Sequence, residues 1–158
     1  MAQAIDPKDA DLFDGFGNGS LHLYVVCTPD WKPYQDGDIR YLDLDFHGND
    51  WETLLWNALD AGKTKYDEYV EGEDIMELHE RNRKKFQQSI PDYPMLARIY
   101  DMYEDYLYTP EEITELRSEC LHLKTKLTEA NAVKALRKLV YACDEVSKTG
   151  CNLMFVCD

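Results

Sequence analysis

Two stretches in the last third of the chain repeat apolar residues at alternating spacings of three and four positions. The first stretch contains Ile113, Leu116, Cys120, Leu123 and Leu127, and the second contains Val133, Leu136, Val140 and Cys143. Residues three and four positions apart lie on one face of an α-helix, so each stretch predicts a helix with an apolar face. Because only a short break at residues 128–131 separates them, we expect the two helices to form an antiparallel hairpin.

Signals for helix ends flank both stretches. Thr109 and Glu112 have the spacing of a capping box, and Pro110 stands at the first helical position, where its missing N–H has no cost. Gly150 follows the second stretch, and glycine commonly ends a helix there by adopting a left-handed conformation. The hairpin is therefore expected to run from residue 110 to residue 149.

The rest of the chain predicts strands and further helices. Residues 21–27 and 151–157 are apolar runs rich in β-formers, and apolar and acidic residues alternate over residues 39–46. Helices are expected between Asn49 or Asp50 and Gly62, over residues 73–88 with Ile75 in the apolar stripe, and over residues 95–107 with Leu96, Ile99, Tyr103 and Tyr106 on the apolar face. The fold class is therefore α+β, in one domain over residues 1–158 with residues 1–19 as a flexible lead-in. A small mixed or antiparallel sheet, built from the N-terminal strands and the C-terminal strand, is covered by four or five helices that include the C-terminal helical hairpin.

The acidity of the chain is confined to its first half. Residues 1–80 contain 19 Asp and Glu against 5 Lys and Arg, whereas residues 81–158 contain 12 of each, so the first half carries the whole net charge of −14. A concentrated anionic region repels nucleic acids and anionic membranes, and it attracts basic partners over roughly one Debye length, about 8 Å at physiological salt. The chain has no apolar run long enough for a membrane span and no signal-peptide pattern, so we expect a cytoplasmic protein.

This charge distribution favours a protein-interaction domain over an enzyme. We expect a basic protein partner, bound as an inhibitor, immunity-type protein or regulatory subunit would bind it, with no cofactor and no catalytic residue. The chain itself is expected to be a monomer or a dimer. The predicted partner-binding residues are Asp36, Asp38, Asp67, Glu68, Glu71, Glu73, Asp74, Tyr100 and Glu104.

An alternative function comes from a cluster at the end of the second predicted strand. Asp43, Asp45, His47 and Asp50 supply carboxylate and imidazole groups, which are ligands for divalent ions. The stretch D-F-H-G-N at residues 45–49 resembles the first metal motif of the metallophosphoesterases. The resemblance implies a metal-dependent hydrolase that uses these four residues.

The companion motifs of a metal site are missing from the sequence. Metallophosphoesterases require later segments in which glycine precedes histidine or asparagine, but the later histidines here, His79 and His122, have no glycine neighbour. An EF-hand calcium loop starting at Asp43 needs glutamate at its twelfth position, which is Leu54. We therefore expect no bound metal. The five cysteines include no C-x-x-C pair, which indicates reduced, mostly buried thiols rather than a zinc site.

Overall fold

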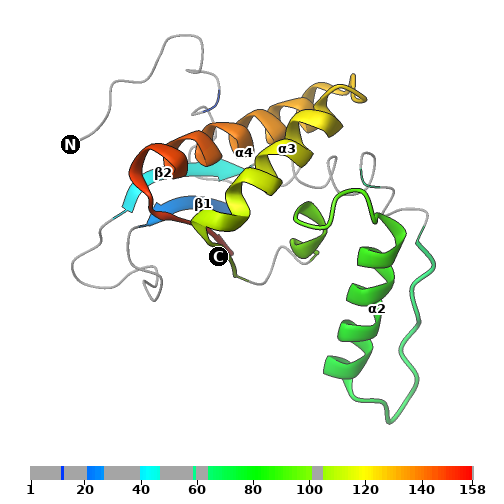
Figure 1. The fold of residues 1–158 in the computed structure, drawn as a ribbon. Helices are drawn as coiled ribbons and strands as arrows, with labels where there is room; N and C mark the ends of the chain where they lie inside the picture. The colour runs from blue at the N-terminus through cyan, green and yellow to red at the C-terminus, as the bar shows by residue number, and fades with distance from the viewer. Residues whose placement is uncertain are drawn as a thin grey trace.

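The computed structural model of the 158-residue chain describes residues 12, 21–26, 40–46, 59, 64–100 and 105–157, with residues 21–26, 40–46, 156 and 157 as backbone only. The elements in chain order are β1 (Leu21–Val26), β2 (Arg40–Phe46), α2 (Ile75–Ser89), the short 3-10 helix η4 (Leu96–Arg98), β3 (Tyr106–Tyr108), α3 (Pro110–Lys124), α4 (Ala130–Thr149) and β4 (Asn152–Cys157). A sheet with helices packed on it makes this part of the chain an α+β fold (Figure 1).

The strands form one antiparallel sheet in the order β2-β1-β4-β3. β4 comes from the end of the chain and pairs with β1 from its beginning, so that Phe155 lies opposite Leu23. β3 pairs with the other edge of β4, where Tyr108 lies opposite Leu153. The sheet thus joins N-terminal strands to a C-terminal strand, and it contains one strand, β3, that the sequence did not predict.

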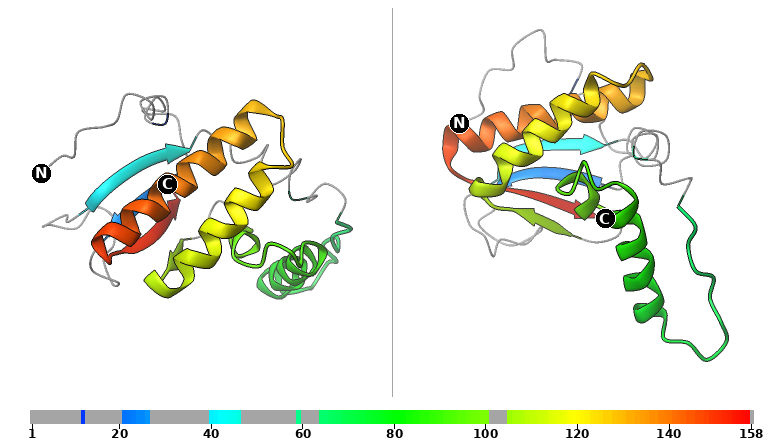
Figure 2. Two further views of the ribbon diagram at one scale, coloured as in Figure 1. Left: turned by 45° about the horizontal axis from the view of Figure 1, so that its top comes forward. Right: turned by 45° about the vertical axis from the view of Figure 1, so that its right-hand side comes forward.

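α3 and α4 lie side by side across one face of this sheet (Figures 1 and 2). α4 contacts α3 as well as β1, β2 and β4, so its buried surface is wider than one stripe. Leu136 and Cys143 are fully buried as predicted, but Val133 and Val140 are only half-buried, and Leu139 is buried as well. A helix that packs against two neighbours buries a broad face, which a single spacing pattern underestimates.

The α+β class and the C-terminal helical pair are confirmed. Residues 64–100 and 105–157 contain three α-helices, and the helix predicted between Asn49 or Asp50 and Gly62 lies outside the described residues, so the total of four or five stays a prediction. In the described part of the chain, no helix is both long enough and apolar enough to cross a lipid bilayer.

The ends of the helical pair lie where the sequence placed them. Glu112 accepts a hydrogen bond of 3.1 Å from the backbone N–H of Thr109, and Pro110 is the first residue of α3. Gly150 has a φ of 69° and ends α4 by donating its N–H to the carbonyl of Val146 at 2.8 Å. These local signals are confirmed because capping depends on residues only a few positions apart.

The helix predicted over residues 95–107 is wrong. Its first part is the three-residue η4, and its last residues belong to β3. Leu96 and Ile99 are buried, as the predicted apolar stripe required, but Tyr108 is buried because β3 pairs with β4 and its hydroxyl donates to the carbonyl of Met95 at 2.6 Å. The edge of β4 offers backbone groups that need hydrogen-bond partners, and this tertiary pairing overrides the helical spacing.

The cysteines follow the prediction in part. Cys120 and Cys143 are buried free thiols; burial raises the pKa of Cys120 well above its ordinary value and that of Cys143 to about 12. Cys151 departs from the prediction because it is disulfide-bonded. Disulfide pairing depends on which segments become neighbours in the fold, and the spacing of cysteines in the sequence does not reveal that.

Candidate functional site

An arm formed by residues 64–89 projects away from the sheet and from the α3–α4 pair (Figures 1 and 2). It consists of an extended segment, a tight turn and α2. The backbone N–H of Glu73 donates to the carbonyl of Val70 at 3.0 Å, and Gly72 has a φ of 86° at the third position of the turn, as a type II turn requires. Asp74 then caps α2 by accepting from the backbone N–H of Met76 at 2.8 Å.

Side chains of α2 hold the extended segment in place. Asn82 accepts from the backbone N–H of Asp67 at 2.8 Å and donates to its carbonyl at 3.1 Å. The carboxylate of Asp67 pairs with Lys85 and Arg81, and these two cations lower its pKa. Arg81 also pairs with Glu73. The negative charges of Asp67 and Glu73 are thus neutralised by cations within the arm.

Tyr100 packs at the base of the arm. Its ring centroid lies 5.4 Å from the rings of Phe86 and His79 and 6.1 Å from the ring of Tyr66. The guanidinium of Arg83 lies 5.9 Å from the same centroid. These rings come from the extended segment, from α2 and from the residues after η4, so Tyr100 fastens the arm to the body of the protein.

The tip of the arm, residues 68–77, carries acids that take no part in this internal network. Glu68, Glu71 and Glu77 are exposed, and none of their carboxylates forms a hydrogen bond or an ion pair with another residue that the structure describes. Residues 66–77 contain six Asp and Glu and no Lys or Arg, and in the described part of the chain only Asp67 and Glu73 among these acids form ion pairs with the cations of α2. The end of the arm is therefore a site of uncompensated negative charge.

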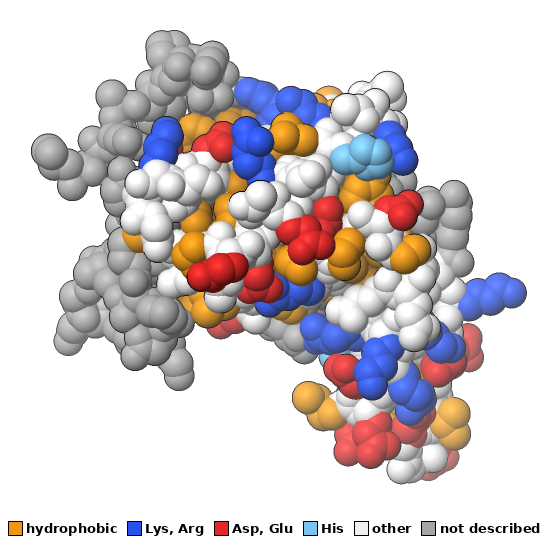
Figure 3. Space-filling model, viewed as in Figure 1, with side chains coloured by type: hydrophobic (Ala, Val, Ile, Leu, Met, Phe, Trp, Pro, Cys, Tyr) orange, Lys and Arg blue, Asp and Glu red, His pale blue; other side chains and the backbone are white. Residues whose placement is uncertain are grey.

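Large apolar side chains are exposed at the same tip. The exposed fractions are 55% for Tyr69, 66% for Val70, 67% for Ile75 and 72% for Met76. Among the described residues, one further large apolar residue is exposed, Leu121 on α3, at 37%. Figure 3 shows acidic and hydrophobic side chains together at the end of the arm. The placement of Ile75 in an apolar stripe was wrong, because the first turn of α2 lies beyond the residues that pack on this helix.

Sequence reasoning missed this apolar tip, although the sequence contains a signal for it. Each apolar pair is enclosed by acids, as E-Y-V-E at residues 68–71 and as D-I-M-E at residues 74–77. The turn around Gly72 separates the two copies of this pattern and places one on each limb of the arm. An open hollow of about 730 Å³ lies beside the turn and is lined by Tyr66, Asp67, Glu68, Val70, Glu73 and Arg81.

The predicted partner-binding residues fall into three groups. On the arm, Glu68 and Glu71 are exposed and unpaired, whereas Asp67, Glu73 and Asp74 stabilise the arm itself. Tyr100 lies at the base of the arm, half-buried among aromatic rings. Asp36, Asp38 and Glu104 lie outside the described residues.

The alternative metal cluster lies beyond what the structure describes. His47 and Asp50 are outside the described residues, and Asp43 and Asp45 belong to β2, where only the backbone is described. Among the side chains that the structure describes, no group of three or more His, Cys, Asp or Glu is arranged to hold a metal ion.

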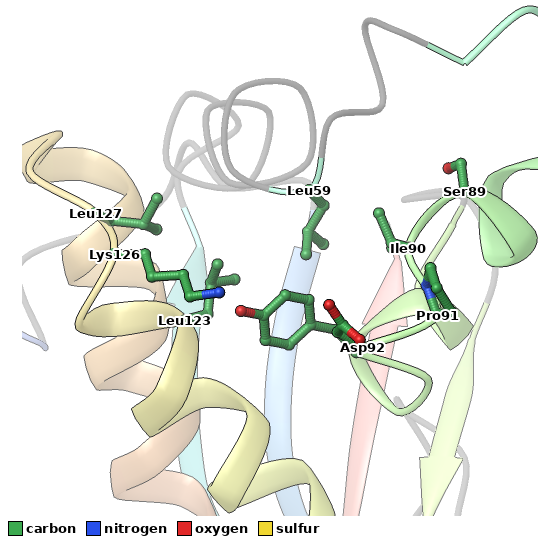
Figure 4. A pocket seen from close by; sticks show the side chains of 9 residues that line it. Leu59, Ser89, Ile90, Pro91, Asp92, Leu123, Lys126 and Leu127 are labelled. Carbon is green, nitrogen blue, oxygen red and sulfur yellow. The ribbon is translucent and has the colours of Figure 1, made fainter.

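A second hollow, of about 320 Å³, lies between the end of α3 and the connection from α2 to η4. Leu123, Lys126 and Leu127 approach it from one side, and Ser89, Ile90 and Pro91 from the other, with Leu59, Asp92 and Tyr93 completing the described lining (Figure 4). The hydroxyl of Tyr93 is already paired with Nδ1 of His122 at 2.9 Å. The charged groups of this lining, Asp92 and Lys126, are exposed, so the hollow holds no desolvated charge that would select a ligand.

Comparison with known proteins finds no family model, no curated protein and no solved structure that matches this chain. Its function is therefore inferred from the chemistry of the arm.

Proposed function

We propose that this chain is an acidic protein-interaction domain that binds a basic protein through the tip of its arm. The observation that carries the proposal is the exposure of Glu68, Glu71 and Glu77 at the end of a projecting arm, with no cation in the described part to neutralise them. Uncompensated carboxylates attract surfaces rich in Lys and Arg, and they repel nucleic acids. The partner that fits is a basic enzyme or toxin. This chain would bind it as an inhibitor, an immunity-type protein or a regulatory subunit does.

The arrangement of charge on the arm supports binding over a general role in solubility. Arg81 and Lys85 pair with Asp67 and Glu73 near the middle of α2, and they leave the charge at the tip uncancelled. Acids that served only solubility would not need to be gathered at one end of a projecting element. Charge concentrated there steers a basic partner toward the tip and raises the association rate, which salt then reduces.

A matched pair of charge reversals tests the proposal. Glu71 lies at the tip and Glu115 lies on α3; both are exposed, so Glu71→Lys and Glu115→Lys change the net charge equally. Immobilised full-length chain should retain a basic protein from extracts of its native cells, and Glu71→Lys should reduce the association rate several-fold while Glu115→Lys has little effect. Raising the salt from about 50 to 500 mM should remove most of this difference. Equal effects of the two reversals would mean that the acidity acts only through overall charge.

A further inference from the structure

We infer that the apolar residues of the tip anchor the complex: Tyr69, Val70, Ile75 and Met76 enter an apolar groove of a basic protein whose rim carries Lys and Arg. This inference rests on the proposed function and adds to it the contact that holds the partner after charge has attracted it. Long-range charge governs mainly the rate of association, whereas buried apolar and aromatic anchors govern mainly the rate of dissociation.

The distribution of exposed apolar residues supports this anchor. Single exposed apolar residues are common on soluble proteins and need no explanation. Here, however, four of the five large apolar residues exposed in the described part lie within residues 69–76. Tyrosine and methionine are also residue types enriched in protein interfaces. Such a concentration at the end of an arm indicates a surface that a partner covers.

The backbone of the tip is held in place before any partner binds. The turn hydrogen bond from Glu73 to Val70 and the Asp74 cap on α2 fix the two limbs relative to each other. The ion pairs of Arg81 with Asp67 and Glu73 tie the extended segment to the helix. Because these contacts already order the tip, binding loses less conformational entropy than it would for a flexible loop.

The charges beside the two apolar pairs indicate which kind of partner binds the tip. Glu68 and Glu71 enclose the first apolar pair, and Asp74 and Glu77 enclose the second. A groove that accepts these pairs therefore meets carboxylates at its edges, and Lys or Arg at those edges would complement them. A second copy of this chain would bring the same carboxylates and a net charge of −14, and an anionic membrane would likewise repel the tip.

Photo-crosslinking from the tip tests the inference in the full-length chain. Tyr69→p-benzoylphenylalanine places the reactive group among the apolar residues, and Leu121→p-benzoylphenylalanine is the matched control at the exposed apolar position on α3. The Tyr69 probe should form a covalent complex with a basic protein, attached at an apolar residue that has Lys or Arg beside it. Adding Met76→Ser, which removes apolar surface without changing charge, should reduce the yield about tenfold or more. The Leu121 probe should give no such product.

The outcomes separate this inference from the proposed function. If the charge-dependent assay retains a basic protein but the Tyr69 probe does not attach to it, the apolar anchor is wrong and the acidic interaction domain stands. Attachment that Met76→Ser leaves unchanged also overturns the anchor. Crosslinking of the Tyr69 probe to a second copy of the chain would overturn the inference of a basic partner and would indicate self-association. If neither assay yields a basic protein, both proposals fail.

Discussion

The carboxylate of Glu119 on α3 accepts a hydrogen bond of 3.0 Å from the backbone N–H of Leu96, the first residue of η4. The same carboxylate accepts from the N–H of Met95, at 3.0 Å to one oxygen and 3.1 Å to the other. The hydroxyl of Tyr108 donates to the carbonyl of Met95, so both backbone groups of this residue are held by the body of the protein. Because Tyr100 follows η4 by two positions and packs against α2, Glu119 also supports the base of the arm.

Glu119→Gln is expected to lower the free energy of unfolding by at most about 1 kcal/mol at low pH, because the protonated carboxyl that it replaces is also neutral and accepts from backbone N–H groups mainly through its carbonyl oxygen. Burial raises the pKa of Glu119. The contribution of this residue to the free energy of unfolding is therefore complete below the ordinary pKa of glutamate and is lost as the pH rises through the raised pKa. In urea denaturation curves, the cost of Glu119→Gln should therefore shrink as the pH rises above the ordinary pKa of a glutamate side chain.

Glu112→Gln is the control for this pH dependence, because the pKa of Glu112 is shifted in the opposite direction to that of Glu119. The Thr109 backbone N–H and the Arg98 guanidinium lower the pKa of Glu112. Its contribution is present above its ordinary pKa and is lost as the pH falls through the lowered value, so the cost of Glu112→Gln should be about 1 kcal/mol near neutral pH and should shrink in acid. Parallel pH profiles for the two variants would contradict the assigned roles.

Leu116→Ala and Leu136→Ala should each lower the free energy of unfolding by about 2–4 kcal/mol, because both side chains are fully buried between α3, α4 and the sheet. Leu121→Ala on the outer face of α3 should cost less than about 0.5 kcal/mol. Denaturant unfolding of the three variants provides the measurement. A cost below about 1 kcal/mol at both buried positions would show that the two helices are packed with different faces inward.

Cys120 and Cys143 should resist thiol reagents in the native protein. Both thiols are buried, and their raised pKa values keep them protonated, which removes the nucleophilic thiolate. Mass spectrometry after iodoacetamide treatment at about pH 8 should find these two cysteines unmodified, and both should react in denaturant. Modification faster than global unfolding would mean that the α3–α4 interface opens locally.

Glu71→Lys and Glu73→Lys should affect the arm differently, although they are two positions apart. Glu71 has no partner in the described part of the chain, whereas Glu73 pairs with Arg81 and accepts from the backbone N–H of Val70. Hydrogen exchange in residues 64–74 should therefore accelerate in Glu73→Lys and stay unchanged in Glu71→Lys. Equal exchange in the two variants would show that the Arg81 pair does not order the arm.

Features that depend on residues close together in the sequence were predicted correctly, whereas features that depend on distant segments were not. The capping box of Thr109 and Glu112 and the left-handed Gly150 were predicted at the correct residues, because each depends on neighbours within four positions. Over residues 95–107 the same reasoning failed, since the hydrogen-bond partners of this segment lie on β4 and on Glu119. Apolar spacing correctly indicated that Leu96 and Ile99 are buried, but it did not indicate the backbone geometry that buries them.

The candidate site shows the same division between local and tertiary information. The sequence by itself determined where the negative charge lies, because charge is a property of residue type, and it predicted α2, because helix signals are local. Only the tertiary structure decided which carboxylates are available to a partner. Asp67 and Glu73 lie within reach of Arg81 and are neutralised, while Glu68 and Glu71 form no ion pair with a described cation. The exposure of Ile75 and Met76 was decided in the same way, since burial depends on what packs beside a residue after the chain has folded.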